Sequence, residues 1–208
     1  MAASESLGPM LADKAADVLA NVKETRYVHT QSVDAAAGIY DVDCSGFVSW
    51  ILQQIAPRHL KQIPVDDSAH RPLAHNYYQF FASRSVEAEQ GWQQIFGLSK
   101  AGRGDLVAWQ LADSPHGGDT GHVFVVQGLP LPNPDGTFRV SVIDASDVKH
   151  FEDSRGTGPG QFATGVGSGF IHFQVDGEGN PTAFQFNANE APKAVPIAIC
   201  RIQPLGSS

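Results

Sequence analysis

The stretch YDVDCSGFVSW, residues 40–50, places Cys44 between an aspartate and a Ser-Gly pair, directly ahead of an apolar helical pattern. Asp43 stands where a helix N-cap is expected, and Pro57 follows the end of the pattern. The apolar residues that share one helical stripe with Cys44 are Phe47, Val48, Ile51 and Ile55. The stretch therefore predicts a buried helix with Cys44 in its first turn.

Cys44 can pack, form a bridge or attack a substrate. A lone cysteine on an apolar helix face is usually a small core residue. The chain has two cysteines, so a bridge to Cys200 is possible in an oxidising compartment and would exclude Cys44 as a nucleophile. A nucleophilic thiol must ionise, and a helix N-terminus or a neighbouring imidazole promotes its ionisation. The choice depends on whether the chain supplies a base.

His122 is the best candidate for that base among eight histidines, because it opens the apolar run HVFVVQ (122–127). Asp144 ends the next β-rich run, FRVSVID (138–144). Alone, the two residues would be an ordinary strand-end histidine and a turn cap. If the two runs pair antiparallel, the start of one lies beside the end of the other. The sequence thus predicts a Cys44–His122–Asp144 triad.

The arrangement of elements along the chain favours an α+β fold. A helical pattern covers residues 11–22, and residues 58–103 suggest short helices and loops. The remainder predicts a mostly antiparallel sheet of about six strands, and the run 122–127 is apolar enough to be buried on both faces. We expect one domain over residues 1–208, with flexible ends at 1–9 and 204–208. The six β-rich runs are 105–109, 122–127, 138–144, 169–175, 182–186 and 195–202.

Composition excludes several classes of function. The formal net charge of −8 argues against nucleic acid, which requires a basic surface. No apolar run is long enough to cross a membrane, and no secretory signal is visible. We therefore expect either a cytoplasmic protein or a processed extracytoplasmic form. His116, His150 and His172 lack ligand spacing, so neither a metal nor a cofactor is predicted.

Three segments together resemble the NlpC-type cysteine peptidases, papain-like enzymes that cut peptidoglycan stem peptides. These segments are DCSGFV (43–48), GDLVAW (104–109) and GHVFVV (121–126). The resemblance covers most of residues 10–146. It implies a papain-like fold in which the nucleophile helix packs on the sheet. It also implies cleavage of the γ-D-glutamyl–diamino acid bond, with a peptidoglycan fragment or small peptide as the binding partner.

Carried over to this chain, the resemblance implies that Cys44 is the nucleophile, His122 the general base and Asp144 the third residue. It further implies that Tyr27 lines the active site. Asp43 and Ser45 match residues that hold the free amino end of the substrate.

The chain departs from the family pattern at several positions. The third residue is usually His, Asn or Gln rather than aspartate, and Thr30 replaces a glycine of the family pattern. The region after residue 146 has no counterpart. These departures affect the expected substrate more than the Cys-His pair.

Two alternatives to the peptidase stay open. A thiol acyltransferase or an amidase can use the same Cys-His pair on a substrate that does not come from the cell wall. A degenerate domain can bind cell-wall fragments without cutting them. The presence of a cysteine, a histidine and a polar third residue argues for an enzyme.

Overall fold

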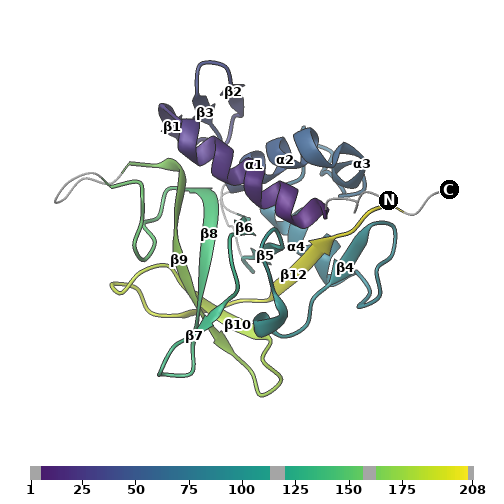
Figure 1. The fold of residues 1–208 in the computed structure, drawn as a ribbon, viewed down its shortest axis with the longest axis vertical. Helices are drawn as coiled ribbons and strands as arrows, with labels where there is room; N and C mark the ends of the chain where they lie inside the picture. The colour runs from purple at the N-terminus through teal and green to yellow at the C-terminus, as the bar shows by residue number, and fades with distance from the viewer. Residues whose placement is uncertain (1–5, 113–119, 157–162, 206–208) are drawn as a thin grey trace.

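The computed structural model describes residues 6–112, 120–156 and 163–205, and shows a mixed α+β fold (Figure 1). Four α-helices lie on one side of a large β-sheet, and a smaller sheet lies beside them. The α+β class predicted from the sequence is confirmed. Among the described residues, no helix has the length and apolar character that a membrane crossing requires.

The helices follow the sequence patterns closely. The four are α1 (Leu7–Asn21), α2 (Cys44–Ile55), α3 (Pro57–Leu60) and α4 (Ala74–Ala82), with a 3₁₀ turn η1 (Leu98–Lys100). Helix α2 starts at Cys44, because the Asp43 carboxylate caps it by accepting a 2.7 Å hydrogen bond from the Gly46 N–H. Part of the N-terminal end that we expected to be flexible is helical, since α1 begins at Leu7.

The large sheet has nine strands, so the expected number of about six was too low. Six strands match the predicted runs: β5 (Leu106–Gln110), β6 (Gly121–Val126), β8 (Phe138–Ser146), β9 (Gly165–Val175), β10 (Pro181–Gln185) and β12 (Ile197–Ile202). The other three are β4 (Trp92–Gln94), β7 (Leu131–Pro132) and β11 (Lys193–Ala194). Strands of two or three residues are too short to show an alternating pattern, so sequence periodicity missed them.

The pairings in the large sheet are antiparallel, and the strand order is β11-β10-β9-β8-β6-β5-β12-β4, with β7 beside β8. Strand β6 is central and buried along its whole length, as its apolar sequence predicts. Val123 and Val125 pack in the core cluster that contains the helices. Phe124 and Val126 pack in a second cluster that includes Trp109. Both faces of the sheet are therefore covered by core.

A small sheet immediately precedes α2 in the chain. It consists of β1 (Glu24–Arg26), β2 (Ser32–Asp34) and β3 (Ile39–Asp41), in the order β1-β3-β2. The Thr25 hydroxyl donates to the Tyr40 carbonyl over 2.6 Å and accepts a 2.9 Å hydrogen bond from the Val166 N–H on β9. These bonds join the small sheet to the large one just before Cys44.

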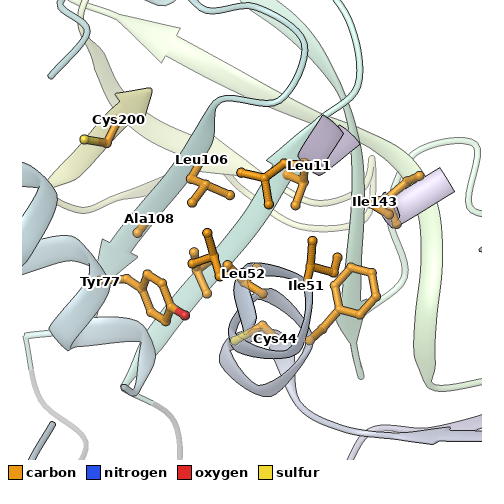
Figure 2. Packing of buried hydrophobic residues seen from close by; sticks show 14 of the residues in the cluster. Leu11, Cys44, Ile51, Leu52, Tyr77, Leu106, Ala108, Ile143 and Cys200 are labelled. Atoms are coloured by element: carbon orange, nitrogen blue, oxygen red, sulfur yellow. The ribbon is translucent and has the colours of Figure 1, made fainter. Parts of the chain in front are cut away.

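The two cysteines lie apart in the core and are both free thiols (Figure 2). Cys44 begins α2, whereas Cys200 lies in β12. The bridge that the sequence left open is absent. Burial raises the pKa of the Cys200 thiol to about 12, so Cys200 stays un-ionised near neutral pH.

We predict that Ile51→Ala lowers the free energy of unfolding by about 2–5 kcal/mol, because Ile51 is fully buried where α2 packs in the core (Figure 2). Gln53→Ala is the matched control, since Gln53 is on the exposed side of the same helix. Urea denaturation of both variants measures the difference. Equal losses in the two variants would contradict the packing of α2 described above.

Candidate active site

Cys44 lies at the N-terminus of α2, against the beginning of β6. Its side chain is buried, and its Sγ is 4.0 Å from the Gly121 carbonyl oxygen. Gly121 has a φ of 138°, and a Cβ at this position would collide with the Trp109 carbonyl on β5. A glycine is thus required immediately before His122. The thiol therefore contacts the backbone of the residue that precedes the predicted base.

The structure brings His122 and Asp144 together. The His122 Nε2 lies 2.6 Å from the Asp144 Oδ2, and both side chains are buried. Strands β6 and β8 pair with Val125 opposite Ile143, so residues 122 and 144 are diagonal neighbours on one face of the sheet. The proximity expected from pairing these two strands is present.

The charge state of Asp144 fixes the tautomer of His122. Burial alone would raise the pKa of the Asp144 carboxyl, but the Arg155 guanidinium and the hydrogen bonds from His122 and His150 outweigh burial. That pKa is held well below its usual range, so Asp144 is an anion and can only accept hydrogen bonds. The His122 Nε2 must therefore carry a proton, which leaves Nδ1 as the basic nitrogen of the ring.

Two further residues complete the surroundings of Asp144. The His150 Nε2 lies 2.7 Å from the Asp144 Oδ2, and the Arg155 Nη1 lies 3.1 Å from the Oδ1. Sequence reasoning set His150 aside because it lacks ligand spacing, and it did not single out Arg155. Both residues lie in the chain that follows β8 and folds back over its end. No local sequence pattern predicts that the chain folds back in this way.

His122, Asp144 and His150 also offer ligand atoms that all lie within 4.8 Å of one another, as a metal site would. However, Asp144 is already paired with the Arg155 guanidinium, which is itself buried. A divalent cation would have to bind beside that fixed positive charge, and it would displace two short hydrogen bonds. The donor set fits proton handling better than metal binding.

Asp43 and Ser45, the residues expected to hold a substrate ammonium, are already bonded to Arg71. The Arg71 Nη2 donates to the Asp43 Oδ2 over 2.7 Å, and its Nη1 donates to the Ser45 Oγ over 2.5 Å. The Ser45 hydroxyl in turn donates to the Asp43 Oδ1 over 3.1 Å. A substrate ammonium would therefore have to compete with a guanidinium of the chain itself.

Tyr27 lines a pocket of about 490 Å³ together with Gly121 and His122. The rim includes Glu190 and Lys193, which are exposed. The apolar wall residues include Trp109, Leu111, Val148, Phe184 and Phe186, whereas Ser146 and Asp147 add polar groups. The pocket thus combines apolar walls with polar and charged groups.

A second hollow, of about 590 Å³, lies beside Arg71 and is lined by His29 and His70 among others. The Tyr27 and His29 rings, from the two hollows, meet edge to face at 5.6 Å. The two hollows therefore adjoin along the segment that leaves β1.

Comparison with known proteins finds similarity to a viral protein. Uncharacterized protein R653 of Acanthamoeba polyphaga mimivirus is 25% identical over 205 residues, which cover 86% of this chain and 88% of the viral protein. No model of a known protein family matches the chain, and no solved structure matches it. The match extends over nearly the whole fold and carries no information on activity.

Because the folded-state pKa of Asp144 is below its unfolded value of about 3.9, its ionisation stabilises the protein above that pH. The contribution is lost as the pH falls through the folded-state pKa. We predict that Asp144→Asn costs about 3–5 kcal/mol near pH 7, since it leaves Arg155 without this partner. The difference from wild type should narrow below about pH 4.

Denaturation curves between pH 7 and pH 3 test this prediction, with Asp17→Asn on the exposed side of α1 as the control. A difference that stays constant over this pH range would show that Asp144 does not carry a stabilising charge.

Proposed function

We propose that this protein is a cysteine hydrolase that cleaves amide bonds through Cys44, His122 and Asp144. One observation carries the proposal: the 2.6 Å bond from the His122 Nε2 to a buried, ionised Asp144. That bond holds a basic imidazole directly after the residue whose carbonyl contacts the Cys44 thiol. A thiol at a helix N-terminus beside an oriented imidazole is the arrangement that nucleophilic catalysis requires.

The proposed reaction begins when the His122 Nδ1 takes the proton of the Cys44 thiol. The thiolate attacks the substrate carbonyl carbon, and backbone N–H groups at the start of α2 stabilise the resulting oxyanion. The tetrahedral intermediate collapses, the C–N bond breaks, and His122 gives its proton to the leaving amine. Water, activated by His122, then hydrolyses the thioester on Cys44. Asp144 stabilises the imidazolium in both halves of the reaction.

The substrate we propose is a peptidoglycan stem peptide, cut at the γ-D-glutamyl–diamino acid bond. This assignment rests on the resemblance of residues 43–48, 104–109 and 121–126 to the NlpC-type peptidases. The position of Cys44 at a capped helix start supports only the cysteine nucleophile that this resemblance implies.

Incubation with a muropeptide digest, followed by mass spectrometry, tests the peptidase. We expect the intact protein to cleave after D-glutamate and Cys44→Ala to lose at least about a thousandfold in rate, because the nucleophile is gone. Cys200→Ala is the matched control and should keep activity, since Cys200 is a buried core thiol. Cleavage that persists in Cys44→Ala would refute the mechanism.

Labelling with iodoacetamide at neutral pH separates the remaining possibilities. Rapid alkylation of Cys44 without muropeptide cleavage would indicate a live nucleophile with another substrate. An inert Cys44 in a protein that binds muropeptides would favour the degenerate binding domain.

A second candidate function is an amidase or acyltransferase for a substrate with an apolar acyl group. The Arg71 guanidinium is hydrogen-bonded to the Asp43 and Ser45 side chains, which disfavours binding of a substrate with a free amino end there. The apolar walls of the pocket beside His122 can take an uncharged acyl group.

p-Nitrophenyl esters from acetate to octanoate test this candidate. We expect kcat/KM to rise by roughly threefold to fourfold per added methylene while the chain fills the apolar pocket. Leu111→Asp, in the pocket wall, should reduce octanoate turnover far more than acetate turnover. A rate that is independent of chain length, in a protein that cleaves muropeptides, would favour the peptidase.

A further inference from the structure

We propose that His150 is a positioning residue that acts through Asp144 to limit how strongly His122 holds a proton, with Arg155 as the fixed counter-charge. The inference rests on the proposed function, because it assigns a role relative to a catalytic His122. The hydrogen-bond network that contains His150 is present in the structure whether or not His122 is catalytic.

The His150 ring is fixed by contacts on several sides. Its side chain has no exposed surface, and its Nε2 lies 2.7 Å from the Asp144 Oδ2, the same oxygen that His122 contacts. The ring stacks on Phe186 with 4.8 Å between ring centroids and an interplanar angle of 1°. The backbone N–H of His150 donates to the Asp153 Oδ2 over 2.7 Å. His150 therefore presents one nitrogen to Asp144 in one orientation.

The hydrogen bonds indicate that His150 is neutral. Because Asp144 is an anion, the His150 Nε2 must donate to it and therefore carries the proton. The His150 Nδ1 is buried and has no hydrogen-bond partner within the described part of the chain. A bare Nδ1 is a buried acceptor without a donor, but a protonated Nδ1 would in addition bring a second positive charge to the carboxylate that Arg155 already pairs with. His150 thus acts as a neutral N–H donor.

Arg155 supplies the permanent positive charge. Its Nη1 donates to the Asp144 Oδ1 over 3.1 Å and to the Gly165 carbonyl over 3.0 Å. Its Nε and Nη2 donate to the two Asp153 oxygens, each over 2.9 Å. Asp153 therefore anchors both Arg155 and the His150 backbone. The Asp144 Oδ1 is bonded to Arg155, and the Oδ2 is shared by two imidazoles.

The sharing of one oxygen has a chemical consequence. Two N–H groups that bond to the same carboxylate oxygen each receive less of its electron density than a single donor would. Loss of the His150 N–H would leave His122 as the sole imidazole on the Oδ2, and the positive charge on its ring would be better stabilised. His150 therefore keeps the affinity of His122 for a proton lower than a simple aspartate–histidine pair would.

The charged and titratable groups around His122 come from several elements. Those of the described residues that contact the network or line the adjoining pocket are Tyr27, Cys44, Asp144, Asp147, His150, Asp153, Arg155, Glu190 and Lys193. Asp147, Glu190 and Lys193 are exposed at the pocket, where solvent screens their effect. Asp144, His150 and Arg155 are fully or almost fully buried, so they dominate the electrostatic environment of His122.

Imidazole ¹H–¹⁵N NMR measures the titration midpoint of His122 and the tautomer of His150 directly. We expect wild-type His150 to show the neutral Nε2–H tautomer. In His150→Phe, which keeps the stacking surface against Phe186, the His122 midpoint should rise by about one pH unit. His150→Gln should return the midpoint toward wild type, because its amide restores an N–H donor.

His172→Phe is the matched control, since His172 stacks on Phe151 outside this network and its loss should leave the His122 midpoint unchanged. An unchanged midpoint in folded His150→Phe, or a wild-type His150 protonated at Nδ1, would overturn the proposal. If His150→Phe does not fold, the wild-type tautomer still decides, because a His150 that is protonated at Nδ1 would overturn the proposal.

Stoichiometric addition of Zn²⁺ is a further arm of the test. Metal-induced shifts of both Nε2 resonances in wild type would also overturn the proposal, because these nitrogens would then be ligands rather than donors. An inert Cys44 together with the expected NMR shifts would refute the hydrolase while leaving the role of His150 intact.

Discussion

The buried carboxylate of Asp144 is the constraint on which the site depends. An anion removed from water is tolerated only when donors surround it, and Asp144 has three: His122, His150 and Arg155. These donors come from β6 and from the chain that follows β8. The need to pair the Asp144 carboxylate therefore joins β6 to the segment that follows β8. The same carboxylate holds the imidazole of His122 in one tautomer.

The N-terminus of α2 imposes a second constraint. Asp43 caps the helix and also binds Arg71, so the same carboxylate shapes the nucleophile turn and fills the space beside it. Arg71 therefore pairs with the two polar residues on either side of Cys44 in the chain, and the pocket at the start of β6 lies against Gly121 and His122. Because Arg71 is bonded to both Asp43 and Ser45, a cationic group would have to displace it in order to bind there.

The two-sided burial of β6 explains why both constraints meet at one place. Its alternate side chains pack toward the helices on one face and toward Trp109 and Phe173 on the other. His122 lies on the second face, where the apolar surroundings make an isolated charge costly. The Gly121 carbonyl, just before it, contacts the Cys44 thiol. The start of this strand thus links α2 to the buried His122–Asp144 pair.

The sequence by itself determined the elements whose signals are local: the capped start of α2 at Cys44, the six longer strands and the His122–Asp144 pair. A cap and an alternating apolar pattern are each written within a few residues, and the pairing of two successive strands follows from their order. Cys44 and Cys200 remained ambiguous, because whether two thiols meet depends on the fold.

Only the tertiary structure decided the three-residue shell around Asp144, the short strands and the capture of Asp43 by Arg71. Arg71 and Asp43 are 28 residues apart, and no periodicity connects them. His150 and Arg155 reach Asp144 only because the chain after β8 folds back over it. These contacts form because the buried charge of Asp144 must be paired. The charge is buried only when the surrounding core has folded and excluded water, so no local sequence pattern shows the contacts.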